Sequence, residues 1–281
     1  MTIVVRGVLV PSLLYGTAWK EERTEALVVS ALDAGFRGID TANQRKHYFE
    51  AAVGRALARK LADGSVRREE LFIQSKFTSE DGQDHRLPYE RAAPISQQVE
   101  QSFRSSLEHL GVPTLDSLVL HGPSQREGWA RADREAWAAM EALADRGAVT
   151  LLGVSNVSAQ QVAELVRIAR VAPAFVQNRC YAARGWDRAV RALCDANQIV
   201  YQGFSLLTAN RDVLAHAGVR ALAARHGKTP AQVVFRFAQQ IGMLPLTGTS
   251  DPVHMKQDLA IADFELAPAE LAIVEGAGLA R

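Results

Sequence analysis

Apolar and polar positions follow two repeating patterns along most of the chain. Short runs rich in Val, Ile, Leu and Phe alternate with longer segments in which apolar residues recur every three or four positions. The first pattern is typical of strands buried on both faces, and the second of amphipathic helices. The runs predict eight strands, at Leu13–Gly16, Arg37–Thr41, Leu71–Phe77, Leu115–His121, Thr150–Ser155, Ala174–Asn178, Ile199–Ser205 and Met243–Gly248.

The segments between these runs carry the usual signals of helix ends. Ser158 and Thr229 stand where an N-cap is expected, and Pro230 follows at a first helical position. Gly35 and Gly227 stand where helices are expected to stop. Helices are predicted at Glu22–Ala34, Phe49–Leu61, Pro94–Leu110, Trp129–Arg146, Ala159–Arg170, Trp186–Ala196, Val213–His226, Pro230–Ile241 and Pro268–Gly276.

The alternation of strands and helices predicts a parallel sheet. Eight repeats favour closure into a (β/α)₈ TIM barrel, and the 281 residues are near the roughly 250 of one such barrel. No GxGxxG motif follows the first strand, which argues against an open dinucleotide-binding sheet. We therefore expect an α/β protein with a single domain over residues 1–281, with room for an N-terminal β-hairpin.

Composition narrows the function classes. Hydrophobic residues make up 48% of the chain, which argues against disorder, and the net charge of +1 shows no basic stripe for nucleic acid. The two cysteines, Cys180 and Cys194, form no CxxC pair and suggest neither a metal site nor an oxidising compartment. No apolar run reaches the roughly 18 residues that span a bilayer. We expect a cytoplasmic monomer or weak homo-oligomer that binds neither membranes nor metals.

Four polar residues stand at or just after the ends of predicted strands. Asp40 closes GFRGID, Lys76 closes LFIQSK and His121 closes LDSLVLH, while Tyr48 lies in the loop after Asp40. Each has an ordinary structural explanation when taken alone, such as a helix cap for Asp40 or a surface position for Lys76. Because barrel enzymes build their sites at the carboxyl ends of the strands, the joint occurrence indicates an active site.

These four residue types suit the reduction of a carbonyl group. Hydride arriving at the carbonyl carbon leaves negative charge on the oxygen, which a tyrosine such as Tyr48 can protonate. We expect the ammonium of Lys76 to lower the pKa of this phenol, and Asp40 to hold the ammonium in place. An imidazole such as His121 can orient the carbonyl oxygen. Two other classes remain open: a cofactor-binding regulatory subunit with little or no turnover, and a hydrolase or aldolase that uses Lys76 as a Schiff base.

Nine segments spread over the chain share one family pattern: GFRGIDTA, AAVGRAL, LFIQSKF, LDSLVLHGP, LLGVSNVS, FVQNRCY, GFSLL, HGKTPAQVVFRFA and LPLTGTSDPVHMKQDL. With these segments the chain resembles, over essentially its whole length, the aldo-keto reductases of the compact bacterial or fungal type with a shortened C-terminal loop. The resemblance implies the barrel, NAD(P)H as hydride donor, reduction of a small aldehyde or ketone to an alcohol, and the tetrad Asp40, Tyr48, Lys76 and His121.

The same resemblance implies the residues that contact the cofactor. Ser155 and Asn156 match the pair that holds the nicotinamide carboxamide, and a third contact falls on Gln177 or Asn178. Phe204 matches the aromatic residue that stacks on the nicotinamide ring. The other implied contacts are Gly16 and Thr17, Ser205, Leu206 and Leu207 along the pyrophosphate, and Gly248, Thr249, Ser250, His254, Gln257 and Asp258 toward the adenosine.

Two departures from the family pattern affect these assignments. The loop after Asp40 is longer than usual, and counting back from Val53 puts His47 at the usual tyrosine position; we favour Tyr48 because it is the one phenol nearby. His47 and Trp19 become candidates for substrate binding. In many relatives a lysine and an arginine bind the 2′-phosphate of NADPH. This chain has Gly248 and His254 at those two positions, so NADH becomes an alternative to NADPH.

Overall fold

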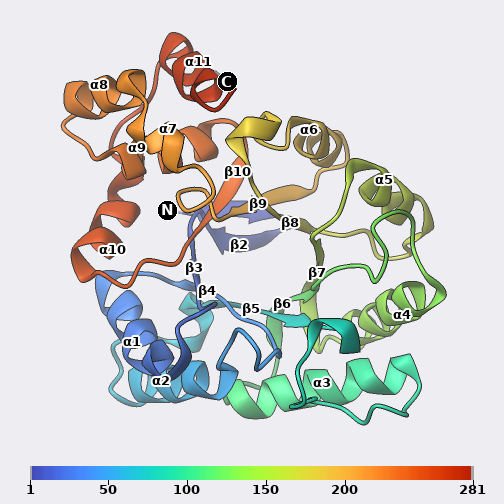
Figure 1. Cartoon of the computed structure of the whole chain (residues 1–281). Helices are drawn as coiled ribbons and strands as arrows, with labels where there is room; N and C mark the ends of the chain where they lie inside the picture. The colour runs from blue at the N-terminus through green and yellow to red at the C-terminus, as the bar shows by residue number, and fades with distance from the viewer. Residues whose placement is uncertain (1, 280–281) are drawn as a thin grey trace.

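Eight parallel strands form a closed barrel in the computed structural model, which describes residues 2–279 (Figure 1). Neighbours around the barrel follow chain order, and the last strand closes the ring by pairing with the first, Leu246 opposite Leu14. The predicted (β/α)₈ barrel is confirmed. Its strands are β3 (Leu14–Gly16), β4 (Gly38–Asp40), β5 (Phe72–Phe77), β6 (Leu115–Leu120), β7 (Val149–Ser155), β8 (Phe175–Arg179), β9 (Val200–Phe204) and β10 (Met243–Thr247).

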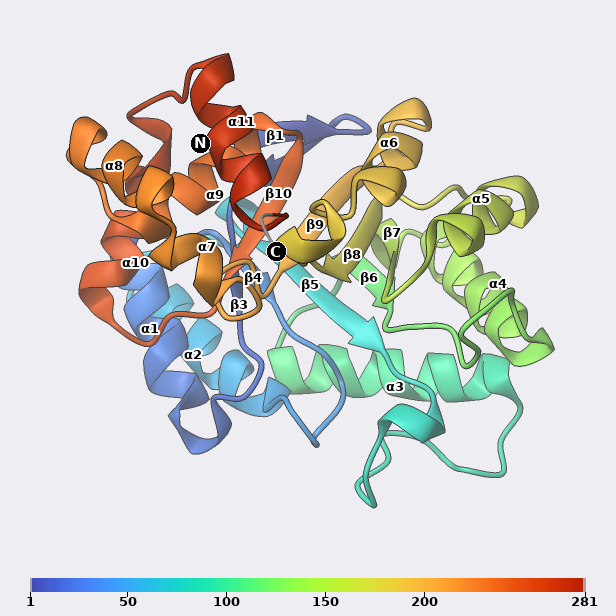
Figure 2. The ribbon, with the colours of Figure 1, turned by 45° about the horizontal axis from the view of Figure 1, so that its top comes forward.

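Helices surround the barrel and cover the outer faces of its strands (Figure 1). A helix precedes each strand from β4 to β10, and a further helix after β10 packs beside the first one, which completes the ring. The last helix, α11, lies outside the ring beside α8 (Figure 2). The helices are α1 (Thr24–Ala34), α2 (Glu50–Ala62), α3 (Ile95–Leu110), α4 (Arg131–Asp145), α5 (Ala159–Ile168), α6 (Arg188–Ala196), α7 (Arg211–Ala215), α8 (Ala217–His226), α9 (Pro230–Gln240), α10 (Pro252–Leu259) and α11 (Pro268–Ala277).

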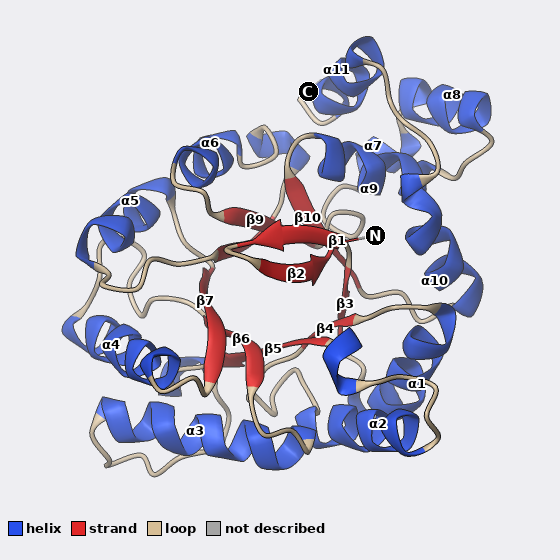
Figure 3. Cartoon of the chain, turned by 180° about the vertical axis from the view of Figure 1, so that it is seen from behind, coloured by secondary structure: helices blue, strands red, loops and turns tan. Residues whose placement is uncertain are grey.

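An antiparallel hairpin, β1 (Thr2–Val5) with β2 (Val8–Pro11), closes the amino-terminal end of the barrel (Figure 3). Val5 and Val10 from the hairpin join a buried apolar cluster with Phe72 and Phe175 from the barrel strands. The hairpin anticipated from the sequence is therefore present. With this end filled by side chains, a ligand enters the barrel from the opposite, carboxyl-terminal end.

One predicted helix is two helices in the structure. The segment 213–226 contains a break at His216, whose backbone is extended (φ −63°, ψ 131°) and whose Nδ1 accepts a hydrogen bond from Gly218 N at 3.2 Å. His216 thus acts as an N-cap and starts α8 separately from α7. Other helix ends agree with the sequence signals, since the side chains of Ser158 and Thr229 cap α5 and α9.

The barrel and its helices share one large apolar core, which lies between the outer strand faces and the inner helix faces. None of the helices within residues 2–279 is long and apolar enough to cross a membrane. The interior of the barrel is different, because it holds buried polar side chains from several strands, among them Asp40, Gln74, Lys76, Gln177 and Gln202.

Candidate active site

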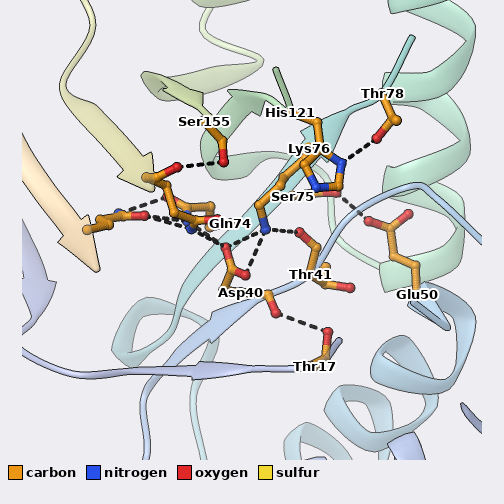
Figure 4. Close-up of polar contacts among 12 residues, drawn as sticks. Thr17, Asp40, Thr41, Glu50, Gln74, Ser75, Lys76, Thr78, His121 and Ser155 are labelled. Atoms are coloured by element: carbon orange, nitrogen blue, oxygen red, sulfur yellow. Dashed lines mark hydrogen bonds and ion pairs between the residues drawn. The ribbon is translucent and has the colours of Figure 1, made fainter. Parts of the chain in front are cut away.

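The four polar residues singled out from the sequence come together at the carboxyl-terminal end of the barrel. Asp40 is the last residue of β4, Lys76 lies near the end of β5, and His121 directly follows β6. Figure 4 shows the three side chains pointing toward one another from neighbouring strands. Tyr48 reaches the same place from the loop between β4 and α2, where its ring lies against His121.

Lys76 and Asp40 form a buried ion pair. Lys76 Nζ donates to both carboxylate oxygens of Asp40 at 2.7 Å and to the carbonyl oxygen of Thr41 at 2.8 Å. The side chains are 1% and 4% exposed, so the ammonium depends on these acceptors in place of water. Burial lowers the pKa of Lys76, and the charge of Asp40 opposes this effect. The pair therefore keeps a positive charge fixed inside the barrel.

Tyr48 lies near both this ammonium and the imidazole of His121. Lys76 Nζ is 5.2 Å from the centre of the Tyr48 ring, and the rings of Tyr48 and His121 meet edge to face with centres 5.9 Å apart. Burial, followed by the charge of Asp40, raises the pKa of Tyr48. This direction is opposite to the lowered pKa expected from Lys76, because burial of the phenol is the larger effect. The phenol remains protonated at neutral pH.

His121 is a neutral imidazole in this setting. Its Nδ1 lies 2.7 Å from the hydroxyl of Thr78, just beyond the end of β5. Burial lowers the pKa of His121 to about 3, with further contributions from the charges of Lys76 and His47. His121 borders the cavity described next, so its ring can form a hydrogen bond with a ligand there.

A cavity of about 380 Å³ opens beside these residues. It extends from Tyr48 and His121 to the segment after β10, and its wall is formed by strand ends and the loop after β9. The residues predicted from the sequence that border it are Gly16, Trp19, Asp40, Tyr48, His121, Ser155, Asn156, Gln177, Phe204, Ser205, Leu206, Leu207, Gly248 and Thr249.

Polar groups line one side of the cavity, at the end of β7. Ser155 Oγ donates to the carbonyl oxygen of Gln177 at 2.6 Å, and Asn156 Nδ2 donates to the carbonyl oxygen of His121 at 2.8 Å. Asn156 has a left-handed backbone (φ 57°), and so has Ser205 on the facing loop (φ 57°). Such backbone costs about 1 kcal/mol or more in a residue other than glycine, and it is concentrated at functional sites.

Other predicted contacts lie outside the cavity wall. Thr17 is buried and donates to the carbonyl oxygen of Asp40 at 3.0 Å, and Asn178 bonds to both backbone groups of Val157. Of the Gln177 and Asn178 pair, Gln177 is the one that borders the cavity. Asp258 accepts from the hydroxyl of Thr247 at 2.6 Å. Among the remaining residues near α10, Ser250 and His254 are exposed and Gln257 is half-buried.

His47 packs against Trp19, a residue of the cavity wall. Its ring stacks on Trp19 with centres 3.9 Å apart, and its carbonyl oxygen accepts from Trp19 N at 2.7 Å. Trp19 is 70% exposed and borders the cavity. The two candidate substrate-binding residues are therefore neighbours at the cavity entrance, and Tyr48 is the one beside Lys76.

Two buried residues below Asp40 were missed in the sequence. Gln74 Nε2 donates to Asp40 Oδ1 at 2.7 Å (Figure 4). Gln202 Oε1 accepts from Gln74 Nε2 at 2.9 Å. A usable signal was present for Gln74, because it stands two residues before Lys76 and side chains two apart share a face of a strand. Lys20 was missed as well; it donates to the carbonyl oxygen of Gly248 at 2.7 Å, and burial lowers its pKa to about 8.

The fold and this cavity together define a (β/α)₈-barrel enzyme. A sequence model described as Aldo/keto reductase family matches residues 13–278, nearly the whole chain. The protein belongs to the aldo/keto reductase family and is an NAD(P)H-dependent oxidoreductase. The resemblance stated from the sequence is thereby confirmed.

Several reductases are similar to it in sequence. An aldo-keto reductase of Mycobacterium avium is 32% identical, over 91% of this chain and 82% of its own length. A probable NAD(P)H-dependent D-xylose reductase of Emericella nidulans is 30% identical, over 87% of this chain and 82% of its own. A mouse aldo-keto reductase, family 1 member A1, is 29% identical, over 94% of this chain and 85% of its own length.

Solved structures share the fold. An aldo-keto reductase from a Medee basin deep-sea metagenome library superimposes with a TM-score of 0.85 at 21% identity, covering 100% of this chain and 96% of its own. The aldose reductase of Schistosoma japonicum gives a TM-score of 0.85 at 22% identity, covering 100% of this chain and 93% of its own. At these identities the likeness concerns the barrel architecture.

Proposed function

We propose that the protein reduces small aldehydes or activated ketones to alcohols, with Tyr48 as the proton donor. The observation that carries the proposal is the position of Tyr48, whose ring lies 5.2 Å from Lys76 Nζ and edge-on to His121 at the cavity. Similar proteins include a probable NAD(P)H-dependent D-xylose reductase. The carbonyl oxygen of a substrate would lie between Tyr48 and His121.

The cavity suits a reduced nicotinamide, which supplies hydride when it is bound. The side-chain NH2 group of Asn156 already donates to the carbonyl oxygen of His121, and that of Gln177 donates to Asp40. Asn156 is exposed and Gln177 borders the same wall, so we assign their side-chain oxygens to the amide hydrogens of a carboxamide. The half-buried ring of Phe204 offers a flat apolar surface for the nicotinamide ring. Ser155 supplies a further hydroxyl at the cavity wall. We assign these four residues to the nicotinamide end, and Ser205, Leu206 and Leu207 to the pyrophosphate.

Proton transfer then follows from the state of Tyr48. Its raised pKa keeps the phenol protonated, and an alkoxide forming beside it is a far stronger base, so the proton moves from Tyr48 Oη to the substrate oxygen. The charge of Lys76 then stabilises the phenolate that remains, with Asp40 holding the ammonium in place. His121 orients the carbonyl oxygen through its neutral ring.

We propose NADPH as the cofactor, with NADH accepted as an alternative. Gly248 and His254 stand where basic residues are expected to bind the 2′-phosphate of NADPH. At the start of α10, near the same position, the Asp251 carboxylate accepts a hydrogen bond from Val253 N at 2.7 Å. That carboxylate would repel a second negative charge. Lys20, which donates to the carbonyl oxygen of Gly248, places a positive charge near this end of the cavity and supports NADPH. A comparison of NADH and NADPH dissociation constants tests the assignment, and a large preference for NADPH would overturn the prediction that NADH is accepted.

Tyr48→Phe tests the proton donor. We expect turnover of a reactive aldehyde to fall by about 100-fold or more, while NADPH affinity measured by fluorescence titration stays nearly unchanged. His47→Asn is the matched control and should keep most of the turnover. If the two variants behave the other way round, His47 is the donor. A wild-type protein that binds NADPH and reduces no aldehyde would indicate a regulatory subunit.

We also propose that the protein works in the cytoplasm on a small-molecule carbonyl substrate, without nucleic acid as a partner. Cys180 and Cys194 are both free and buried, which fits a reducing compartment. The assignment rests on this observation and on the composition of the chain.

A further inference from the structure

Thr78 lies where the chain leaves β5, two residues after Lys76. Its hydroxyl is 2.7 Å from Nδ1 of His121, and this is its hydrogen bond within residues 2–279 (Figure 4). The residue is 4% exposed, so it is largely shielded from solvent. His121 Nδ1 is therefore occupied by a protein partner, and the other ring nitrogen, Nε2, is left for the cavity.

The loop after β5 holds Thr78 in place. The carbonyl oxygen of Thr78 accepts from the Tyr89 hydroxyl at 2.9 Å and from Gln83 Nε2 at 3.3 Å. A Cβ added to Gly82 would lie 2.6 Å from Thr78 Cγ2, so the methyl group of Thr78 packs closely against the main chain there. Because a β-branched side chain has few rotamers, these contacts fix the direction of the hydroxyl.

The direction of this hydrogen bond decides what His121 offers to a ligand. A neutral imidazole carries one proton, on Nδ1 or on Nε2. Within residues 2–279 the hydroxyl of Thr78 has Nδ1 of His121 as its hydrogen-bond partner, and it either donates to that nitrogen or accepts from it. If Thr78 donates to Nδ1, the imidazole proton is on Nε2, and the ring presents an N–H to the cavity.

We propose that Thr78 is a positioning residue that holds His121 in the Nε2–H form, so that the imidazole donates a hydrogen bond to the substrate oxygen. The consequence for turnover rests on the proposed carbonyl reduction, whereas the protonation site of the ring does not. An incorrect tautomer would turn a hydrogen-bond acceptor toward the carbonyl oxygen, which is also an acceptor, and would repel it.

The first experiment measures the ring nitrogens of the unmodified protein. Protein labelled with ¹⁵N-histidine, at pH 7 and without cofactor, is examined by long-range ¹H–¹⁵N correlation spectra, with the His121 signals assigned by their loss in His121→Asn. We expect an unprotonated Nδ1 and a protonated Nε2 for His121. A protonated Nδ1 would overturn the proposal whatever the activity of the enzyme.

The second experiment changes the hydroxyl. Thr78→Val keeps the size, the branching and the main-chain contacts of Thr78, and Thr78→Ser keeps the hydroxyl. We expect Thr78→Val to show mixed tautomers and a kcat about 10- to 100-fold lower, comparable to losing the group that orients a functional histidine. Its NADPH affinity should be unchanged, and Thr78→Ser should retain the wild-type spectrum and most of kcat.

The outcomes separate this proposal from the proposed function. An unchanged His121 spectrum and an unchanged kcat in Thr78→Val would overturn the role of Thr78. Should Thr78→Val fail to fold, the spectra of the wild type and of Thr78→Ser still decide the tautomer. If Tyr48→Phe retains turnover, the proton-donor assignment fails, while the tautomer result for Thr78 remains valid.

Discussion

The side-chain amide of Gln177 donates a hydrogen bond of 2.9 Å to Asp40 Oδ1, which joins β8 to β4 inside the barrel. The same amide donates to Gln202 Oε1 at 2.9 Å, and Gln202 Nε2 donates to Gln74 at 3.1 Å. An ionised carboxylate accepts hydrogen bonds and cannot donate them, so Asp40 fixes which atom of each amide faces which neighbour. Gln177, which borders the cavity, and the Lys76–Asp40 pair are thus parts of one buried network.

We predict that this network is coupled energetically. Gln202→Val removes the acceptor that serves both Gln74 and Gln177, and it should lower the free energy of unfolding by about 1–3 kcal/mol. Gln74→Val should cost a similar amount. The double variant should lose about 1 kcal/mol less stability than the sum of the two single losses, because Gln74 and Gln202 are hydrogen-bonded to each other. Urea unfolding of the four proteins measures the coupling, and strict additivity would contradict the network.

The Lys76–Asp40 ion pair predicts that a second substitution can restore the stability of a Lys76 variant without restoring its activity. Lys76→Met leaves the Asp40 carboxylate buried without its cation, and we expect a loss of about 3–5 kcal/mol in the free energy of unfolding. Adding Asp40→Asn to the same chain removes the buried charge and should restore most of that loss. Turnover should remain absent in both variants. Recovery of stability is measured by urea unfolding, and a double variant no more stable than Lys76→Met would argue against the charge as the cause.

Much of the architecture follows from local rules that the sequence displays. The strand runs, the caps at Ser158 and Thr229, and the stops at Gly35 and Gly227 agree with the structure because each depends on a few adjacent residues. The break at His216 was missed, since an imidazole that caps a helix looks like an ordinary polar residue inside one. Local patterns therefore predict elements well and their interruptions poorly.

The site was harder to predict, because it depends on contacts between distant strands. Asp40, Lys76 and His121 could be identified since each lies at a strand end, and strand ends meet at one end of a barrel. The choice of Tyr48 over His47 rested on residue type alone, because the positions of both depend on the course of a lengthened loop that packs His47 on Trp19. The direction of the Tyr48 pKa depends on burial, which no spacing reveals.

Asp258 predicts a dependence of stability on pH. Burial raises the pKa of Asp258 from its ordinary 3.8 to about 6, partly opposed by the hydrogen bond from Thr247. Between these two values the folded chain keeps a proton that the unfolded chain has released, so the contribution of Asp258 to stability falls as pH rises through this interval. Asp258→Asn should therefore be more stable than the wild type at pH 7, by up to about 3 kcal/mol, and similar to it at pH 4.

Thermal unfolding of the cofactor-free protein at both pH values checks this prediction. Asp263→Asn is the matched control, because Asp263 is exposed, pairs with Lys228 at 2.6 Å, and should show no such pH-dependent gain. A variant at Asp258 that gains as much stability at pH 4 as at pH 7 would show that the carboxylate charge is not the cause.

Trp19 predicts a change in substrate affinity that is separate from the chemistry. Trp19 is 70% exposed, its ring packs on His47, and it borders the cavity. Trp19→Ala should raise KM for an aromatic aldehyde by about tenfold, because part of the apolar cavity wall is removed. The kcat should stay within about threefold of the wild-type value, because the proton donor is still present. Stability should change by about 1 kcal/mol or less, as expected for an exposed side chain.

Backbone conformation at the same position supplies the control. Trp19 has a left-handed backbone (φ 60°), which costs an ordinary residue about 1 kcal/mol or more and glycine almost nothing. Trp19→Gly should therefore be at least as stable as Trp19→Ala, the reverse of the usual order, while both share the raised KM. If kcat falls together with the rise in KM in both variants, Trp19 also positions the reacting carbonyl, and its role extends beyond binding.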